Sequence, residues 1–301
     1  MGKGEPVPVR VDPSNTDLFV EYSSRHGKDH DDSYLPNNDF PFGEDYPAYL
    51  LMSGESAVGA ACLMRTKRLT AEGRGRFVIY HTVSGEKRHY AELLQAFRPH
   101  LVDLSYVYLF IPSSRLGVRA AWEELGFAVE RFSFVLKYEG TAVEAPELPP
   151  GFALRPFSAA DTADVVACTE MTNINFAGMG GHVENHTEDI LELFTDPSYV
   201  DDGIMLLTDN QHPVGTLQVA RDEEDSDSAS VEMLSVHPDF RRRGLGRTLL
   251  KKAISFAASR GFRHVHLSVN GENDTAVSLY VASGFAIVKE LVCYGLDVSS
   301  L

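Results

Sequence analysis

A basic turn containing two glycines stands out in a chain whose formal net charge is −16. The segment HPDFRRRGLGRTLL, residues 237–250, carries four arginines between a predicted strand and a predicted helix. The start of a helix presents unpaired backbone N–H groups and the positive end of the helix dipole, and together these bind phosphate. Gly244 and Gly246 would let the backbone curl so that an anion reaches these amides directly. We therefore expect an anion site in this turn.

The turn does not match either of the two common nucleotide-binding motifs. A dinucleotide fingerprint requires a third glycine where this chain has Leu249, and the Gly-Lys-Ser/Thr run of a P-loop is missing. A second group of chemically useful residues follows in NDTAVSLYVASGF, residues 273–285. Asn273, Ala276 and Tyr280 are spaced i, i+3 and i+7, so they share one face of a predicted helix.

Together the two segments resemble the GNAT acyltransferase superfamily. R-x-x-G-x-G, residues 241–246, resembles its cofactor-binding turn, and N-x-x-A-x-x-x-Y-x-x-x-G-F, residues 273–285, resembles its later helix motif. The resemblance covers residues 231–285 and implies acetyl-coenzyme A as co-substrate, with no metal. It implies that the turn amides hold the pyrophosphate and that a strand edge pairs with the pantetheine arm. The cofactor-binding residues that it implies are Leu234, Ser235, Val236, Arg241, Arg242, Arg243, Gly244, Leu245, Gly246, Arg247, Asn273 and Ala276.

The resemblance also implies a reaction, in which an amine attacks the thioester carbonyl directly. A backbone N–H near Ser235 or Val236 would stabilise the oxyanion. Tyr280 would act as general acid for the departing thiolate, since a phenol with a pKa of about 10 stays protonated at pH 7. Glu232 is the proposed base for the amine, directly or through water, while a merely outward-facing strand residue is an equally open interpretation.

Several histidines are weaker candidates. His237 and His266 are alternative bases, although a histidine beside a proline or within a strand is more typical of a structural role. The glycine-rich loop NFAGMGGHVENH, residues 175–186, lies where the family shapes its acceptor pocket. Its His182 and His186 lack an evident third ligand, so they do not predict a metal site. HGKDHDD, residues 26–32, is interpreted as a solvated loop.

The elements that position these residues occur twice. YLLMSGESAVGAACLMR, residues 49–65, aligns with MLLTDNQHPVGTLQVAR, residues 205–221, at an offset of 156. VRAAWEELGFAVERFSFVL, residues 118–136, aligns with AVSLYVASGFAIVKELVCY, residues 276–294, at an offset of 158. Two matches in the same order indicate a duplicated domain, and the proline-containing EGTAVEAPELPPG predicts the linker. We expect a degenerate domain at 1–140, a linker at 141–150 and a catalytic domain at 151–301.

Hydrophobic patterning predicts the element order β-α-α-β-β-β-α-β-α-β-β in the second half. Ser158 is the expected cap of its first helix, and Gly261 is the expected end of the helix that follows the basic turn. As two tandem GNAT domains, the chain is expected to be α+β. Each domain would have a central, mostly antiparallel mixed sheet with helices on both faces.

The first half departs from the pattern that the second half follows. Its turn reads Gly85-x-x-Arg88-x-Tyr90, so both glycines are replaced by bulky residues. Tyr280 corresponds to Trp122 and Asn273 to Arg115. We therefore expect one active site, in the second half, while Arg88 and Arg115 leave a phosphate site in the first half open.

Composition narrows the function. The 43 acidic residues against 27 basic ones argue against a nucleic-acid partner and weakly favour a cationic small molecule. No apolar run is long enough to span a bilayer and the N-terminus lacks a secretory core, so we expect a cytoplasmic protein. The odd, separated Cys62, Cys168 and Cys293 are expected to be buried free thiols. We expect an N-acetyltransferase for a small amine; a non-catalytic acyl-coenzyme A sensor and a protein lysine or N-terminal acetyltransferase remain the alternatives.

Overall fold

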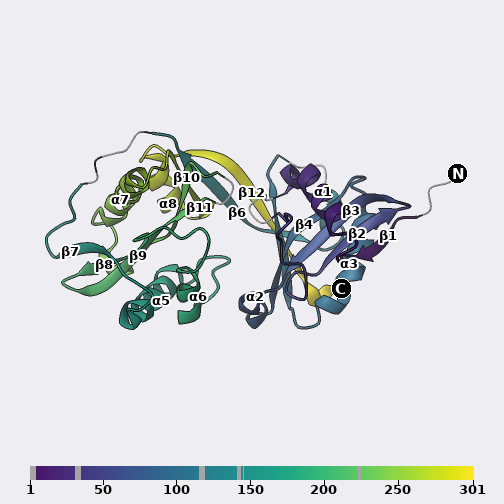
Figure 1. Ribbon diagram of the computed structural model, residues 1–301, viewed down its shortest axis with the longest axis horizontal. Helices are drawn as coiled ribbons and strands as arrows, with labels where there is room; N and C mark the ends of the chain where they lie inside the picture. The colour runs from purple at the N-terminus through teal and green to yellow at the C-terminus, as the bar shows by residue number, and fades with distance from the viewer. Residues whose placement is uncertain (1–4, 31–34, 115–118, 141–143, 145, 223–224) are drawn as a thin grey trace. The chain divides into compact units, whose positions relative to one another are not determined.

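The chain forms two compact units in a computed structural model that describes residues 5–30, 35–114, 119–140, 144, 146–222 and 225–301 (Figure 1). The first unit comprises Met1–Ser133 together with Glu290–Leu301, and the second comprises Phe134–Lys289. The strand β6 (Ala128–Tyr138) and the strand β12 (Ala286–Asp297) each contribute to both units. The compact units therefore do not follow the boundaries of the sequence repeat.

The first unit is built on a mixed sheet in the order β1-β2-β3-β4-β5-β12, in which β4 and β5 pair in parallel and the other neighbours pair antiparallel. Its other strands are β1 (Val7–Arg10), β2 (Ala48–Ser53), β3 (Ser56–Met64), β4 (Arg74–Thr82) and β5 (Tyr106–Pro112). Its helical segments are α1 (Thr16–His26), η1 (Gly27–Asp29), α2 (Lys67–Ala71), α3 (Lys87–Phe97), η3 (Arg98–His100), α4 (Arg119–Glu123) and η6 (Val298–Ser300).

The second unit repeats this plan in the order β6-β11-β10-β9-β8-β7, with β10 and β11 parallel and β7 to β10 antiparallel. Its strands are β7 (Phe152–Pro156), β8 (Ile204–Asp209), β9 (His212–Arg221), β10 (Ser228–Val236) and β11 (His264–Asn270). Its helical segments are α5 (Thr162–Phe176), α6 (Thr187–Glu192), η5 (Pro238–Phe240), α7 (Leu245–Ser259) and α8 (Asp274–Val281).

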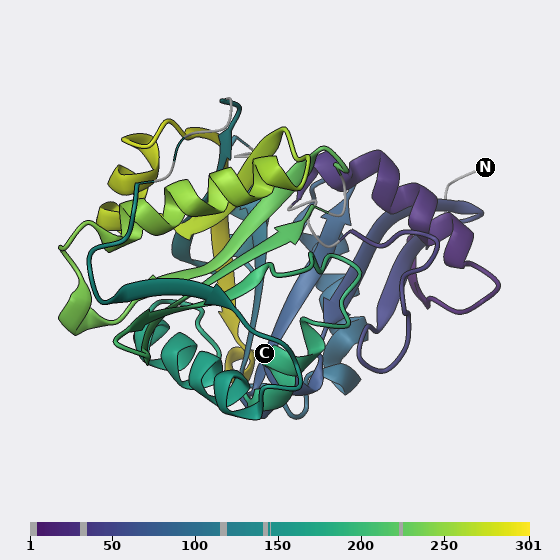
Figure 2. The ribbon, with the colours of Figure 1, turned by 60° about the vertical axis from the view of Figure 1, so that its left-hand side comes forward.

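Helices cover both faces of each sheet because the strands are apolar on both sides. In β8, Ile204 and Leu206 are buried against α5, while the intervening Met205 is buried in the cluster that contains α7 residues. Figure 2 shows α7 and α5 on opposite faces of the second unit's strands. In β2, Leu50 packs with α1 and Leu51 with α3 in the same way. The expected mixed, mostly antiparallel sheet with helices on both faces is confirmed.

The last strand corrects one prediction. A pair of strands is expected after α8, but one continuous strand, β12, runs from Ala286 to Asp297. Its residues from Leu291 onward pair antiparallel with β5, and Val292, Tyr294 and Leu296 are buried in the first unit's core. A change of partner along one strand satisfies its backbone groups without a turn, so the two predicted strands merge.

Two further predictions of local structure are wrong. Asp161, not Ser158, is the N-cap of α5, and its carboxylate accepts hydrogen bonds from the Ser158 backbone N–H and hydroxyl. In HGKDHDD, residues 31 and 32 lie outside the described residues, but His26 ends α1 and His30 is only 2% exposed. The described part of this segment is therefore not a solvated loop. Gly261 follows α7 with φ of +92°, as expected of a residue just beyond a helix end.

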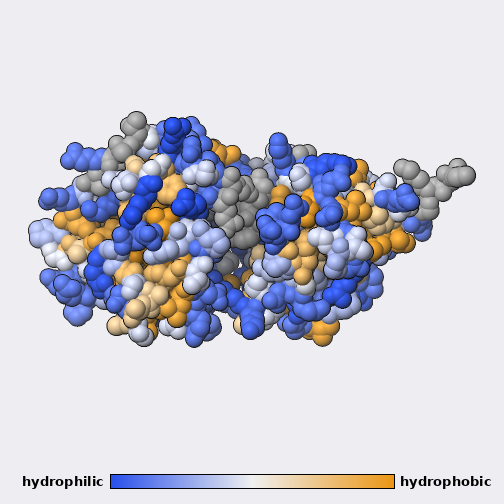
Figure 3. All heavy atoms as spheres, in the orientation of Figure 1, coloured by the Kyte–Doolittle hydropathy of each residue, from blue (hydrophilic) through white to orange (hydrophobic). Residues whose placement is uncertain are grey.

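The remaining predictions concern membrane-spanning helices, the protein surface and the cysteine thiols. Among the described residues, none of the helices is both long and apolar enough to cross a membrane. On the face drawn in Figure 3, hydrophilic side chains are interspersed with smaller hydrophobic areas. All three cysteines are free and buried, which confirms their prediction.

Candidate functional site

The strands β10 and β11 diverge in the middle of the second unit. Their parallel pairing is confined to Ser228–Ser230, opposite His264–His266, whereas β10 stays paired with β9 as far as Val236. A bulge between Glu232 and Ser235, where Met233 has φ of +48°, bends β10 at this point. The edge of β10 from residue 234 onward is therefore open to an extended ligand.

The basic turn lies directly after this open edge and leads into α7. Arg242 and Gly244 have φ of +62° and +80°, so the backbone curls through the left-handed region here. Gly244 is the N-cap of α7, and no side chain caps this end of the helix. Among the described residues, the N–H groups of the first turn thus keep their capacity for an external acceptor. The geometry is that expected for anion binding at a helix N-terminus.

The arginine side chains of the turn have different surroundings. The Arg241 guanidinium donates to the backbone carbonyls of Val236, at 2.8 Å, and of Asn175, at 3.1 Å, so it ties the end of α5 to β10. Arg243 donates to the Asp239 carbonyl and does not line the cavity described below. Arg242 and Arg247 are exposed and line it.

The helix α8 faces the same space. The Asn273 side chain accepts a hydrogen bond from the Ala276 backbone N–H, at 3.1 Å, and so caps α8. Its amide NH₂ group is left as the part that can contact a ligand. Tyr280 is 8% exposed, and burial raises the pKa of its phenol to about 12. This tyrosine therefore stays protonated throughout the neutral range.

One cavity of about 830 Å³ joins these parts, within the usual range of about 300 to 1,000 Å³ for small-molecule sites. It brings together most of the residues that the sequence singled out. The residues that line it are Asn175, Phe176, Met179, Leu234, Ser235, Val236, Pro238, Phe240, Arg241, Arg242, Gly244, Leu245, Gly246, Arg247, Asn273, Thr275, Ala276, Leu279 and Tyr280.

The candidate bases lie outside this lining. Glu232 is exposed on β10 before the bulge, where its carboxylate accepts a hydrogen bond from the Ser230 hydroxyl at 3.1 Å. His237 caps η5 by accepting from the Asp239 backbone N–H, which is a structural role. His266 is half-buried on β11, and burial lowers its pKa.

The two loop histidines have different surroundings. The His182 ring stacks near Phe176, with ring centroids 6.1 Å apart. His186 instead is the N-cap of α6, in a capping box with Asp189.

Asn175, at the end of α5, is a lining residue that sequence reasoning missed. It is 4% exposed, and its Nδ2 donates to the Ser235 hydroxyl at 2.8 Å. The Ser235 and Thr216 hydroxyls are 2.7 Å apart, and Thr216 donates to the Met233 carbonyl at 2.6 Å. Among the described residues, the Asn175 Oδ1 has no hydrogen-bond partner.

The direction of these hydrogen bonds fixes the orientation of the Asn175 amide. A carbonyl only accepts, so the Thr216 proton is used on Met233. Ser235 must then donate to Thr216 and accept from the Asn175 NH₂ group. The chain of donors places Oδ1, not Nδ2, as the unpaired atom of a buried side chain at the cavity wall, which is costly unless a ligand donates to it.

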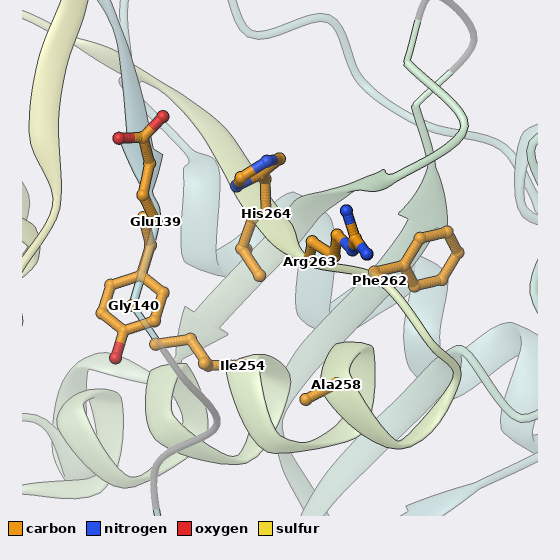
Figure 4. A pocket seen from close by; sticks show the side chains of 9 residues that line it. Glu139, Gly140, Ile254, Ala258, Phe262, Arg263 and His264 are labelled. Atoms are coloured by element: carbon orange, nitrogen blue, oxygen red, sulfur yellow. The ribbon is translucent and has the colours of Figure 1, made fainter.

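A second hollow of about 300 Å³ lies elsewhere on the second unit (Figure 4). Its apolar wall comes from Ile254 and Ala258 of α7 and from Phe262, with Glu139 and His264 above it. Glu139 forms an ion pair with Lys137 at 3.0 Å. Neither the strand opening nor the helix N-terminus borders this hollow, so it lacks the features expected of the site.

The first unit has filled the corresponding positions with aromatic side chains. Tyr90, in the first turns of α3, is fully buried, and Trp122 of α4 is 1% exposed. Their rings pack edge to face, and Trp122 also stacks on Tyr80. Arg88 is exposed and paired with Glu86 at 2.8 Å, and Arg115 lies outside the described residues. Buried aromatic residues thus stand at the sequence positions that correspond to Gly246 and Tyr280 of the second unit.

Comparison with known sequences agrees with this geometry. The Acetyltransferase (GNAT) family matches residues 168–285. A mycothiol acetyltransferase of Actinosynnema mirum is 30% identical over 186 residues, which are 60% of this chain and 61% of that protein. Another, of Clavibacter michiganensis, is 27% identical over 254 residues, 80% of this chain and 78% of that protein. An uncharacterized N-acetyltransferase of Methanocaldococcus jannaschii is 38% identical over 96 residues, 31% of this chain. The matched part of this chain thus spans 61% of the length of the Actinosynnema protein and 42% of that of the Methanocaldococcus protein.

Solved structures share the fold over almost the whole length of this chain. A GCN5-related N-acetyltransferase from Sphaerobacter thermophilus has a TM-score of 0.73 at 18% identity and covers 97% of this chain and 95% of its own. A tandem GNAT protein from the clavulanic acid biosynthesis pathway has a TM-score of 0.62 at 15% identity, with 97% and 98% coverage. At such identities the likeness concerns the fold, and it supports the tandem arrangement.

Proposed function

We propose that the chain transfers an acetyl group from acetyl-coenzyme A to a primary amine of a small molecule, in the cavity of the second unit, since residues 168–285 match the Acetyltransferase (GNAT) family. The observation that carries the proposal is the convergence on one cavity of three features. These are the open edge of β10, the uncapped start of α7 and the buried phenol of Tyr280.

The residues present fit the acetyl donor. The first-turn amides of α7 would receive the pyrophosphate, because they combine free donors with the positive end of a helix 15 residues long. The open edge at Leu234, Ser235 and Val236 would pair with the pantetheine amides. Gly246 leaves room beside the helix, since an added Cβ there would meet only Leu279 Cδ2, at 3.5 Å.

The proposed reaction forms a C–N bond and breaks the C–S bond of the thioester. The amine nitrogen attacks the carbonyl carbon, backbone N–H groups near Ser235 stabilise the oxyanion, and the sulfur leaves as a thiolate. Tyr280 donates its hydrogen bond, and finally its proton, to that sulfur. With a pKa of about 12, the phenol is a weaker acid than a thiol of about 8.5, so its main contribution is stabilisation of the developing charge.

The proton lost by the amine needs an acceptor. Glu232 does not line the cavity, so we propose that it acts through water rather than by direct contact. Asn175 is neutral and cannot take the proton, but its unpaired Oδ1 can accept a hydrogen bond from the attacking amine. We assign it the role of positioning the nitrogen.

The acceptor is best sought among small amines. Relatives at 27–30% identity bear the name mycothiol acetyltransferase. The unacetylated form of mycothiol therefore belongs in a panel of candidate acceptors, beside polyamines, amino sugars and a lysine peptide. Faster turnover of the peptide than of every small amine would instead favour a protein acetyltransferase.

The test measures release of free thiol from acetyl-coenzyme A with this panel. We expect Tyr280→Phe to lower kcat by about 10²-fold or more, the usual contribution of a positioned acid, while the Kd of coenzyme A stays unchanged. Val281→Ala, on the exposed side of the same helix, is the matched control. Cofactor binding with no amine-dependent thiol release, or a Tyr280→Phe rate equal to wild type, would contradict the proposal.

A further inference from the structure

A cluster of two histidines and an aspartate lies in the first unit, away from the cavity of the proposed acetyl transfer. His26 ends α1, Asp29 lies in the following η1, and His81 stands near the end of β4. One ligand atom from each of the three side chains lies within 4.8 Å of the other two. We propose that these residues bind a divalent first-row transition-metal ion, which revises the expectation of a protein without a metal.

The spacing of the donor atoms fits such an ion. The His81 Nε2 lies 3.4 Å from the Asp29 Oδ2. An N–H···O hydrogen bond is normally about 2.7 to 3.2 Å long. Two ligands on a tetrahedral zinc ion, with bonds of about 2.0 to 2.1 Å, lie about 3.3 Å apart. The His26 ring stacks beside the His81 ring, with centroids 4.6 Å apart, so its nitrogens reach the same space.

The surroundings of His81 resemble those of a metal ligand. Its Nδ1 is 2.7 Å from the hydroxyl of Tyr22, which is 4% exposed. A ligating histidine usually makes such a bond with its second nitrogen, because the bond fixes the ring and directs the other nitrogen to the metal. Here the nitrogen bonded to Tyr22 is Nδ1, which leaves Nε2, facing Asp29, as the ligating atom. The Tyr22 hydroxyl therefore sets which atom of His81 is presented.

The donor set selects the class of ion. Two imidazoles and one carboxylate suit Zn²⁺, Ni²⁺ or Co²⁺, whereas Mg²⁺ and Ca²⁺ prefer all-oxygen sites. Three protein ligands leave a further position for water. The Asp29 side chain is 25% exposed and that of His81 is 9% exposed, while His26 is half-buried, so solvent can reach the cluster at Asp29 and His26.

The location of the cluster in the repeat adds an independent observation. At the offset of 156 residues, His81 corresponds to His237, which precedes the glycine turn of the second unit. The His30 ring lies 5.7 Å from that of His81 and 6.4 Å from that of Trp122, the counterpart of Tyr280. The first unit thus has polar ligand-type residues at the end where the second unit has its cavity. An ion there would join α1 to β4.

The test uses the full-length protein with any polyhistidine tag removed, stripped with a chelator and dialysed. Zn²⁺ content is measured by mass spectrometry, and affinity by competition with a chromophoric chelator. We expect one equivalent of Zn²⁺ per chain and a higher Tm with the ion. We expect His26→Gln and Asp29→Asn to weaken binding by at least about tenfold each, and Tyr22→Phe by about tenfold, the usual effect of an outer-shell partner. His212→Gln, at an exposed histidine of the second unit, should bind as wild type does.

Circular dichroism of the stripped variants separates loss of a ligand from loss of the fold. Should the variants unfold, Co²⁺ added to the wild-type protein provides the second measurement, because nitrogen ligation gives a ligand-field spectrum distinct from that of aqueous Co²⁺. The proposal is overturned by wild-type protein that binds no Zn²⁺ beyond the level of the double variant His26→Gln and Asp29→Asn. Equal binding of Mg²⁺, or a Co²⁺ spectrum identical to that of the aqueous ion, overturns it as well.

Discussion

Gly246 tests most directly whether the start of α7 is built for a ligand. It is the second residue of the helix, where glycine lowers stability relative to alanine. An added Cβ would meet only Leu279 Cδ2, at the ordinary contact distance of 3.5 Å. The protein itself therefore gives no steric reason for glycine at this position. We propose that glycine stands here because a methyl group would fill space in the cavity that the ligand needs.

The substitution Gly246→Ala should accordingly have two effects of opposite sign. The free energy of unfolding should rise by about 0.5 to 1 kcal/mol, the difference in helix propensity, which raises Tm by roughly 2 °C for a unit of this size. The affinity for coenzyme A should fall. Loss of one hydrogen bond to a charged phosphate costs about 1.5 to 3 kcal/mol, which corresponds to an increase of about 10- to 100-fold in Kd.

The two glycines that flank α7 serve for comparison with Gly246. Gly244 and Gly261 flank α7 with φ of +80° and +92°, and an added Cβ would meet no atom within 4 Å at either. Alanine should cost about 1 kcal/mol of stability at both positions, because only the backbone conformation is penalised. Only Gly244→Ala should also weaken coenzyme A binding, since Gly244 lines the cavity.

The assay is isothermal titration with coenzyme A, paired with thermal unfolding in the absence of ligand. A Gly246→Ala protein that is more stable and binds coenzyme A as tightly as wild type would refute the assignment of this helix end. A fall in affinity with Gly261→Ala as large as that with Gly244→Ala would show that helix stability, not the turn, governs binding.

Three further predictions follow from the structure. Asn175→Leu should lower kcat/KM for the amine about tenfold, the effect of one lost hydrogen bond, while the Kd of coenzyme A stays unchanged. Steady-state kinetics with varied amine concentration measures this effect. An equal loss of coenzyme A affinity would show that Asn175 contacts the acetyl donor and not the amine. Hydrogen bonds from Arg155 lower the pKa of Asp164, so the pair should stabilise the fold above the unfolded pKa of about 3.9 and lose this effect as pH falls through the folded value. Because the pair is partly exposed, Asp164→Asn should lower the free energy of unfolding at pH 7 by less than about 1 kcal/mol, with no difference from wild type near pH 2 in denaturant titrations. Coenzyme A should bind with one equivalent per chain, since Tyr90 and Trp122 fill the first unit, and a stoichiometry of two in the same titration would contradict the single site.

The sequence was sufficient for features that depend on local backbone chemistry. The glycine turn, the helix that follows it and the shared face of Asn273, Ala276 and Tyr280 all follow from short-range spacing, although the helix begins at Leu245, before the TLLKKAISFAASRG segment predicted for it. The two-fold repeat predicted the sheet, because both halves carry the same hairpin pattern. Such signals depend on residues that are close together along the chain, so they can be recognised without knowledge of the tertiary contacts.

Features that depend on contacts between residues far apart in the sequence could not be predicted. Glu232 was proposed as a base from its place on the strand before Val236, and the sequence did not reveal the bulge between Glu232 and Ser235, which depends on the pairing of β10 with β9. The role of Asn175 depends on a donor chain that reaches Thr216 and Met233, far from it in sequence. The proposed metal-binding role of His81 likewise depends on β4, which places it beside α1.

The pairing of β12 with β5 of the first unit has a consequence for folding during synthesis of the chain. Leu291 to Asp297 pair with Pro112 to Tyr106, so the first unit's sheet is closed by residues synthesised about 180 positions later. Domains usually fold in the order in which they leave the ribosome, and pairings at such separation are slow to form. The early unit must therefore wait, with the edge of β5 exposed, until the late one has been translated. A gene cut at the linker would yield a first half that is missing the strand that completes it.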